Sequence, residues 1–511
     1  METSRSDQSK PAKNAGIYGM ILKRKVLWIN FIILFGVYAL CIFVKHTSPD
    51  FFSTMMNGNA EINLQNGRIL NWLLYEIFGA MGLHPEKNIV LAQLVLTASA
   101  ALSSYWVYTA FAHEVEDQSI NRVLIQIASL MMFINICFWE GWYAFPETVL
   151  FASANLLASY GAFALFAKGV RTNKKRFIVL SHILALVAIY GYQAYVENYI
   201  ILTAIYLLCN TKCKAEKKGI LYTVEVVGIS GLISISSIFS MSLFVKLGIT
   251  KAESRAATFK IKQIFENLKT LWEMQNRIWT NLKGYMPMYI MAILGIVLVI
   301  IILAILLKRS IADAVWTIIV LIGCYISIFL PHIVSSYIWA APRTLIGLFC
   351  FCGGVLCLGA CVLSKSWIKR LATGIASIFI VVSAVQIQII TVNNIVSTRI
   401  DEIQIDEIQR TVDEYEKESG EYVTTFVVGD DTNKIWGNET VNYTIMDTNL
   451  RIMSVYYANV TAINYYTGRN YQKKEMTEDE YQRYFDGKSY DYFDLDEQLK
   501  FDGDKAYLLI Y

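Results

Sequence analysis

Two carboxylates and one guanidinium stand in a polar segment that follows the first apolar run of the chain. Asp50, Glu61 and Arg68 lie between residues 48 and 74, among several asparagines. A carboxylate can accept a proton from a sugar hydroxyl, and a guanidinium can hold a phosphate through two parallel hydrogen bonds. We therefore predict Glu61 and Asp50 as catalytic residues and Arg68 as a phosphate ligand. The structural alternative is that Asp50 caps a helix while Glu61 and Arg68 form a solvated pair.

A second polar segment, FWEGWYAFPETVL at 138–150, places two acids among five aromatic rings. Ring faces can stack on the CH groups of a pyranose while carboxylates bind its hydroxyls. We predict Glu140, Trp142 and Glu147 as sugar-binding residues. Aromatic residues also gather at membrane interfaces, and that alternative accounts for the rings but not for the acids.

Two further segments mix polar and aromatic residues in the same way. Gln193 and Tyr195 are predicted to bind a sugar, and Arg343 is predicted to bind a phosphate. Polar loops that converge on one side of a helix bundle favour a functional site over simple connections. Their other polar and aromatic members are Glu197, His332, Tyr337 and Trp339.

These segments separate about eleven apolar runs of membrane-spanning length. The composition agrees, since 55% of the residues are hydrophobic, 17% are charged and the mean hydropathy is +0.41. A set of soluble domains and a singly anchored enzyme are both excluded, and an α-helical polytopic membrane protein is predicted. The runs cover residues 26–44, 88–112, 122–138, 147–167, 177–192, 196–209, 220–247, 287–307, 312–330, 344–363 and 371–392.

Basic residues set the predicted orientation. They collect at the N-terminus and in alternate loops at 168–176, 211–218, 308–309 and 365–370, which favours the cytoplasmic side for all of them. The polar segments with the candidate site residues then face outward. Two amphipathic helices, at 66–78 and 251–283, are expected to lie along the outer leaflet because their apolar residues recur at helical spacing.

The last part of the chain differs from the rest in charge. Residues 396–511 hold 24 acids and 12 bases, a net charge of −12, which leaves 33 bases and 18 acids for the remainder. We predict a cytoplasmic segment at 1–25, a transmembrane domain at 26–395 and a small extracytoplasmic α/β domain at 396–511. In that tail a polar helix is expected at 397–419, strands at 422–429, 461–466 and 506–511, and a helix at 477–485.

The tail is also predicted to recognise a glycan at the outer face. Its aromatic residues suit a gating or recognition role, whereas its negative charge disfavours contact with a phosphate. The alternative is that these rings form the core of the domain. They are Trp436, Tyr456, Tyr457, Tyr465 and Tyr466.

Cysteine spacing gives no indication of a metal. Cys350, Cys352, Cys357 and Cys361 lack paired C-x-x-C spacing and stand among leucine, valine and glycine, so we interpret them as small, lipid-compatible packing residues. The tail contains no cysteine and therefore no disulfide. We predict no cofactor and no bound ion.

The layout resembles the Gtr-II family of bacterial glucosyltransferases, within the multispanning GT-C class. The likeness rests on the basic-flanked first helix that ends at Lys45, the NGRILNWL element, FWEGWYAFPE, YQAYVEN and the late APR, and it covers roughly residues 25–350. Ala60-Glu61 is a departure, since a closer pair of acids is expected before the Gly-Arg element. Either Glu61 is the base with Asp50 assisting, or the metal dependence of some relatives is absent here.

The resemblance implies a GT-C-like enzyme in a bacterial cell membrane, with a cytoplasmic N-terminus. Such an enzyme takes a hexose, here glucose, from a polyprenyl-phosphate carrier and transfers it to a surface glycan on the outer face. Its partners are then the lipid-linked donor, the glycan acceptor and membrane lipid, with no nucleic acid. A transporter or flippase of lipid-linked glycans is the competing class, although no internal repeat is visible, and a glycan polymerase shares the same topology.

Overall fold

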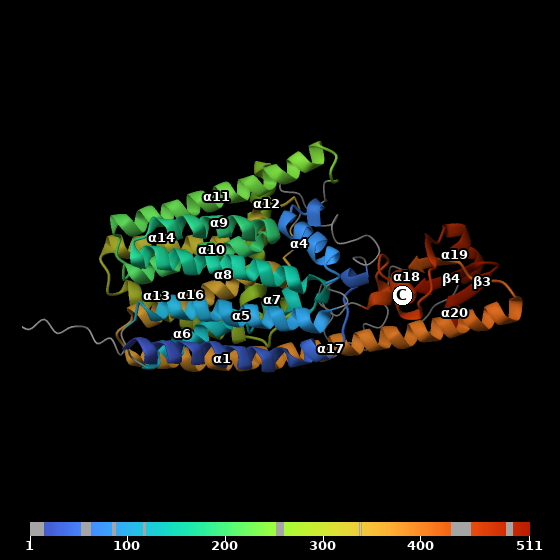
Figure 1. Cartoon of the computed structure of the whole chain (residues 1–511), viewed down its shortest axis with the longest axis horizontal. Helices are drawn as coiled ribbons and strands as arrows, with labels where there is room; N and C mark the ends of the chain where they lie inside the picture. The colour runs from blue at the N-terminus through green and yellow to red at the C-terminus, as the bar shows by residue number, and fades with distance from the viewer. Residues whose placement is uncertain are drawn as a thin grey trace, which may run out of the picture.

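The structure is a computed structural model that describes residues 15–52, 63–83, 88–115, 119–251, 260–336, 338, 340–430, 451–486 and 494–510. Long helices lie side by side in one bundle, and a small mixed domain projects from one end of it (Figure 1). The bundle helices are α1 (Ala15–Phe43), α5 (Ile89–Ala112), α6 (Ser119–Met131), α8 (Val149–Thr172), α9 (Lys175–Gly191), α10 (Ala194–Asn210), α11 (Lys217–Lys246), α13 (Ile290–Leu306), α14 (Ile311–Ser327), α16 (Ile346–Val362) and α17 (Ser366–Ser419).

Each predicted apolar run coincides with one of these helices. Within the described part of the chain, six helical segments are long and apolar enough to cross a membrane, whereas α13, α14 and α16 are apolar but shorter. The chain is thus a predominantly helical membrane protein with a small C-terminal sheet.

Close helix packing in the bundle depends on glycine at a few positions. A Cβ added at Gly353 in α16 would lie 2.6 Å from Met132 Cε and 2.7 Å from the carbonyl oxygen of Ala128. Real Cβ atoms do not approach other atoms so closely, so only glycine lets α16 pack against α6 here. Small residues that permit such close approach are typical of helix interfaces in membranes.

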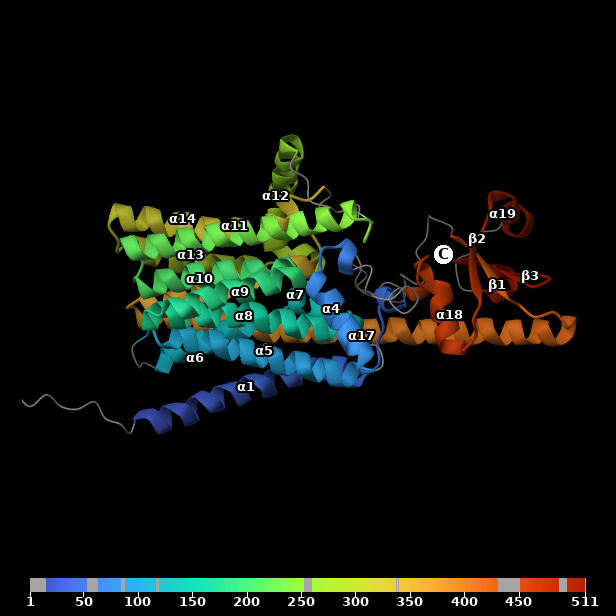
Figure 2. The same ribbon diagram turned by 45° about the horizontal axis from the view of Figure 1, so that its top comes forward.

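Several short helices and the longer α12 lie towards the end of the bundle next to the tail (Figure 1). They are α4 (Ile69–Ala80), α7 (Ile136–Phe138), the π-helix η2 (Trp139–Tyr143), η3 (Pro146–Thr148), α12 (Ile261–Asn281), η4 (Leu282–Gly284), α15 (Leu330–Ile333) and η5 (Pro342–Thr344). Figure 2 shows α12 running across the direction of the bundle helices. Its exposed apolar residues are Ile261, Phe265, Leu268 and Trp272. The amphipathic helix predicted at 251–283 is therefore present as α12.

The last bundle helix continues without a break into the tail. α17 extends from Ser366 to Ser419 and ends where Gly420 takes a left-handed conformation, with φ of 78°. The polar helix predicted at 397–419 is the second half of this single helix, so the predicted domain boundary at 395/396 lies inside α17.

The tail contains a four-stranded sheet in the order β2-β1-β4-β3. β1 is parallel to β2 and β4, with Val427 opposite Lys474 and Tyr507, whereas β3 is antiparallel to β4. The elements are β1 (Thr425–Asp430), η6 (Ile452–Ser454), α18 (Asn459–Thr467), β2 (Gln472–Glu475), α19 (Glu478–Phe485), α20 (Leu495–Gln498), β3 (Leu499–Asp502) and β4 (Lys505–Ile510).

One prediction for the tail is wrong. Residues 461–466 were expected to form a strand, yet they belong to the helix α18. Threonine, isoleucine and tyrosine are common in strands, but over six positions such a preference is weak, and here packing decided the conformation. The strands predicted at 422–429 and 506–511 and the helix predicted at 477–485 are confirmed as β1, β4 and α19.

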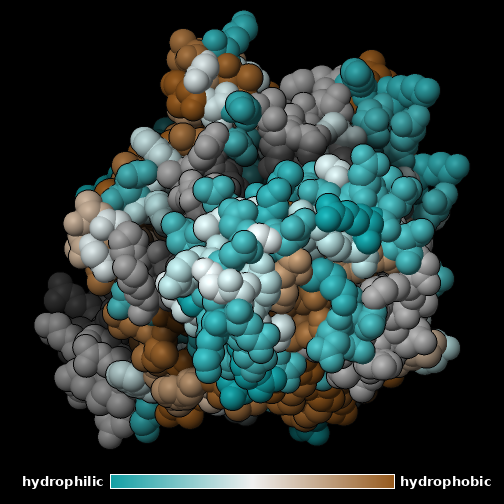
Figure 3. Space-filling view, turned by 90° about the vertical axis from the view of Figure 1, so that its right-hand side faces the viewer, coloured by the Kyte–Doolittle hydropathy of each residue, from teal (hydrophilic) through white to brown (hydrophobic). Residues whose placement is uncertain are grey.

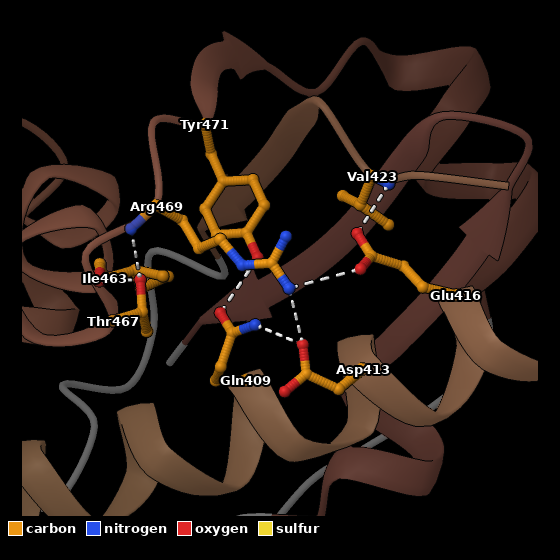
Figure 4. Close-up of polar contacts among 8 residues, drawn as sticks. All are labelled: Gln409, Asp413, Glu416, Val423, Ile463, Thr467, Arg469 and Tyr471. Atoms are coloured by element: carbon orange, nitrogen blue, oxygen red, sulfur yellow. Dashed lines mark hydrogen bonds and ion pairs between the residues drawn. The ribbon is translucent and has the colours of Figure 1, made fainter.

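Polar contacts join the sheet to α17 (Figure 4). Arg469 Nη2 donates to Asp413 Oδ1 at 2.8 Å and to Glu416 Oε2 at 3.3 Å. The Tyr471 hydroxyl donates to Gln409 Oε1 at 2.9 Å. Deeper in the contact, Arg451 Nε donates to the fully buried Asp401 carboxylate at 2.8 Å. The second half of α17 is thus an integral part of the tail. The outward face of the tail is mostly hydrophilic (Figure 3).

Candidate functional site

The segment after α1 carries polar residues that contact the bundle. His46 Nε2 lies 2.7 Å from the carbonyl oxygen of Tyr143, and the Ser48 hydroxyl donates to the Glu147 carboxylate at 3.1 and 3.2 Å. Glu147 is buried in η3, whereas Asp50 is exposed. The two carboxylates interact electrostatically, so the structure brings the acid of the first segment next to an acid of the second.

A buried ion pair joins the second and fifth polar segments. Glu140, in the π-helix η2, accepts a hydrogen bond from the Arg343 backbone N–H at 2.7 Å and forms an ion pair with the Arg343 guanidinium. The Glu140 side chain is 0% exposed and that of Arg343 is 18% exposed. The Arg343 guanidinium also lies 4.8 Å from the centre of the Phe145 ring. π-Helical turns often occur at functional sites because they redirect a side chain, and this one directs Glu140 towards η5.

Arg68 lies at the start of α4, over an aromatic ring. Its guanidinium carbon is 4.7 Å from the centre of the Tyr192 ring, a favourable cation–π geometry. The Tyr192 hydroxyl in turn lies within electrostatic reach of Arg343 and Glu140. Both predicted phosphate ligands therefore flank one tyrosine. Gln193 Nε2 donates to the Asn66 carbonyl oxygen at 2.8 Å, which fixes the turn before Arg68.

Two predicted sugar-binding rings pack on each other. The Trp142 and Tyr195 rings are stacked, with centroids 5.2 Å apart and an interplanar angle of 13°. Both side chains are buried. The Tyr192 ring meets the Trp142 edge at 5.4 Å, so the three rings form one wall beside Arg68.

Lys283 is a cation of this region that the sequence prediction did not single out. Its Nζ donates to the Ala340 carbonyl oxygen at 2.6 Å, and the ammonium interacts with Glu140. Burial and the neighbouring Arg277 lower the pKa of Lys283, while Glu140 raises it. Lys283 belongs to η4, directly after α12, at the end of the stretch 251–283 that the sequence predicts as an amphipathic helix.

His332 supports the segment that carries Arg343. Its Nε2 lies 2.9 Å from the Thr344 hydroxyl. Burial, with a smaller effect from Lys283, lowers the pKa of His332 to about 4. The imidazole is therefore neutral at physiological pH and serves as a hydrogen-bonding group.

Glu197 is a buried carboxyl group at the first turn of α10. It is 0% exposed, and neither carboxyl oxygen has a hydrogen-bond partner among the described residues. A Cβ added at Gly347 would lie 3.0 Å from Glu197 Oε2, so glycine leaves room for this group. Buried polar groups without partners are rare in native proteins, which makes Glu197 a candidate functional group.

The tail reaches the first polar segment directly. The Tyr457 hydroxyl donates to Asp50 Oδ1 at 2.9 Å. Phe51 and Phe52 are buried in the hydrophobic core of the tail, where Phe52 contacts the rings of Tyr465 and Tyr466 at 5.7 and 5.9 Å. The tail is therefore part of the structure that positions Asp50.

Some predicted site residues lie outside the described residues, namely Glu61, Tyr337, Trp339 and Trp436. The others come together from segments far apart in the chain. Asp50, Glu147 and Arg343 form one electrostatic group, and Glu140, Tyr192 and Arg68 continue it. No cluster of three or more histidine, cysteine or acidic side chains that could hold a metal is found among the residues that the structure describes.

A comparison with known protein families identifies the family to which this chain belongs. The family described as glucosyl transferase GtrII matches residues 39–358 of the 511. The chain belongs to the GtrII family of glucosyl transferases. The matched region includes every polar segment at the tail end of the bundle, and it ends before the tail. A search among curated proteins finds no match.

Membership of the GtrII family makes the chain a membrane-associated glycosyltransferase. Such an enzyme has a sugar donor and an acceptor. The predicted family and the predicted class of enzyme are thereby confirmed.

Proposed function

We propose that this glucosyltransferase takes glucose from a polyprenyl-phosphate carrier and attaches it to a surface glycan, on the outer face of a bacterial cell membrane. The proposal rests on the observation that charged side chains from distant segments lie together at one end of an apolar bundle. These residues are Asp50, Glu147, Glu140, Arg343 and Arg68. A lipid-linked sugar phosphate would present its phosphate and sugar at that level while its apolar chain stays among the helices.

The proposed topology has eleven spans in a GT-C-like arrangement, with domains at 1–25, 26–395 and 396–511. It is supported by the position of the basic loops. The connections α8–α9, α10–α11, α13–α14 and α16–α17 lie at the end of the bundle opposite the tail (Figure 1). Since basic loops favour the cytoplasm, the tail and the candidate site are assigned to the outside.

In the proposed reaction, Arg68 and Arg343 bind the phosphate of the donor. Arg68 is held against Tyr192 by its cation–π contact, and Arg343 is oriented by Glu140. When the bond between the sugar C1 and the phosphate oxygen breaks, negative charge develops on the departing phosphate. Guanidinium groups already in place stabilise that charge without reorganisation, which lowers the barrier.

Asp50 is the proposed base among the described residues, and Glu61 remains proposed beside it. The acceptor hydroxyl oxygen forms a bond to C1, its proton passes to the carboxylate, and the lipid phosphate leaves. Asp50 is exposed and its Oδ1 accepts from Tyr457, so Oδ2 is free to turn towards an incoming hydroxyl. Glu147 lies behind it, within electrostatic reach of Asp50.

The proposed sugar subsite uses Glu140, Trp142, Glu147, Gln193 and Tyr195. Trp142 and Tyr195, which are buried and stacked on each other, support the wall of this subsite. The polar groups of Glu147 and Gln193 then bind hydroxyls at its edge.

The test is transfer from a labelled lipid-linked glucose in membranes that contain the full chain. Asp50→Asn keeps the shape of the side chain and removes the base, so the rate constant for transfer is expected to fall by about 10²–10⁴. Arg68→Gln is expected to weaken donor binding by about 1.5–3 kcal/mol. Glu76→Gln, an exposed acid on α4, is the matched control. Full transfer by Asp50→Asn and by Glu61→Gln would end the assignment of the base.

A further inference from the structure

A groove lies on the membrane-facing side of the bundle, far from the candidate site. Its volume is about 450 Å³. α8 forms its floor, while α5 and α9 form its walls; Figures 1 and 2 both show α8 between these two helices. The floor residues Leu157, Gly161, Ala164, Lys168 and Arg171 follow helical spacing and so share one face of α8.

The groove is apolar along most of its length and basic at one end. Trp106, Leu165 and Leu184 line its interior. Lys168 and Arg171, both exposed, line the end that belongs to the basic loop between α8 and α9. Among the described residues that line the groove there is no acidic one. The nearby acid Glu114 accepts hydrogen bonds from Tyr206 and Asn210 of α10 instead.

The length of the groove fits one half of a bilayer. Fourteen residues separate Leu157 from Arg171, which is about 21 Å along a helix at 1.5 Å per residue. The hydrocarbon core of a bilayer is about 30 Å thick, so one leaflet is about 15 Å. The groove thus spans a leaflet, with its basic end at the level of the headgroups.

We propose that this groove binds one anionic phospholipid of the cytoplasmic leaflet, with an acyl chain along α8 and the headgroup phosphate between Lys168 and Arg171. Charge complementarity selects the anionic headgroup, since basic pockets between membrane helices on the cytoplasmic side attract such lipids. Lys168 is held near this position by the Phe177 ring, 4.4 Å from its Nζ. Gly161 leaves the groove open at its centre. A Cβ at this position would lie 3.5 Å from both Leu184 Cδ1 and Trp106 Cζ3, in contact with both walls.

The test is native mass spectrometry of the full chain in detergent, titrated with phosphatidylglycerol or with phosphatidylcholine of the same acyl chains. The wild type is expected to retain one phosphatidylglycerol more tightly than phosphatidylcholine. At about 1 kcal/mol for each base, the double variant Lys168→Gln/Arg171→Gln should weaken phosphatidylglycerol binding about 30-fold. Gly161→Leu should weaken the binding of both lipids, because its side chain occupies the acyl path.

The matched control is Lys174→Gln/Lys175→Gln, which removes two exposed bases of the same loop that do not line the groove. This control should retain phosphatidylglycerol like the wild type. Equal loss in both double variants would show diffuse attraction to the loop and overturn the proposal. Equal retention of the two lipids by the wild type would also overturn it, as would unchanged binding in a folded Gly161→Leu variant.

Discussion

Phe52 connects the proposed catalytic segment to the tail, and its truncation tests whether the tail positions Asp50. The Phe52 side chain is 0% exposed and contacts the rings of Phe51, Tyr465 and Tyr466 at centroid distances of 5.1, 5.7 and 5.9 Å. Replacing a buried phenylalanine by alanine typically costs about 3–5 kcal/mol. This free energy would be lost from the contact between residues 44–52 and α18.

Hydrogen exchange measures this loss directly. Amides that exchange when the segment opens should do so about 150 to 4,000 times faster in Phe52→Ala, since 1.4 kcal/mol corresponds to a factor of ten. The acceleration is expected at residues 44–52 and in α18. Because Asp50 stands two residues before Phe52, the rate constant for transfer should fall, while donor binding through Arg68 and Arg343 should change less.

Tyr422→Ala is the matched control, since this tail tyrosine is 74% exposed and its loss creates no cavity. Unchanged exchange at residues 44–52 in Phe52→Ala would refute the reasoning, because the segment would then be held by contacts other than the tail core. Normal transfer despite faster exchange would show that Asp50 does not depend on this anchoring.

Three further predictions concern the tail contact and the bundle. Tyr457→Phe removes only the hydroxyl that donates to Asp50, so it should lower the transfer rate with little change in the unfolding temperature; a normal rate would remove Tyr457 from the proposed site. Arg343→Ala removes the guanidinium from the buried Glu140 carboxylate and should cost about 3–5 kcal/mol of stability in detergent, part of which Arg343→Ala/Glu140→Gln should recover; an equally unstable double variant would contradict this. The pKa of His332 is about 4 in the folded state and about 6.5 in the unfolded state, so the unfolded state takes up the proton first as the pH falls. The free energy of unfolding should therefore decrease by about 3 kcal/mol between pH 6.5 and pH 4. Unfolding measured against pH should show this decrease in the wild type and a smaller one in His332→Gln.

Much of the fold follows from local sequence properties. Apolar runs predict membrane helices because every backbone polar group in hydrocarbon must be satisfied within the helix itself. The amphipathic pattern that predicts α12 and the capping pattern of α19, in which Thr477 and Glu480 bond reciprocally, are equally local. The number of spans stays a prediction, since α13, α14 and α16 are shorter than a typical span.

The conformation of α18 shows where local pattern fails. Residues 461–466 are rich in residue types that favour strands, yet Ala462 and Ile463 are buried against the core of the tail as part of a helix. The decisive partners, Phe51 and Phe52, come from more than 400 residues earlier in the chain. No window of local sequence contains that information.

The sequence by itself determined which residue types were available for chemistry and on which side of the bundle they stand, because hydrophobicity and charge act locally and additively. Only the tertiary structure decided the pairing. Glu140 meets Arg343 across 203 positions, and Tyr457 meets Asp50 across 407. Such contacts depend on how helices pack, and they turn Arg343 from a separate cation into the partner of a buried acid.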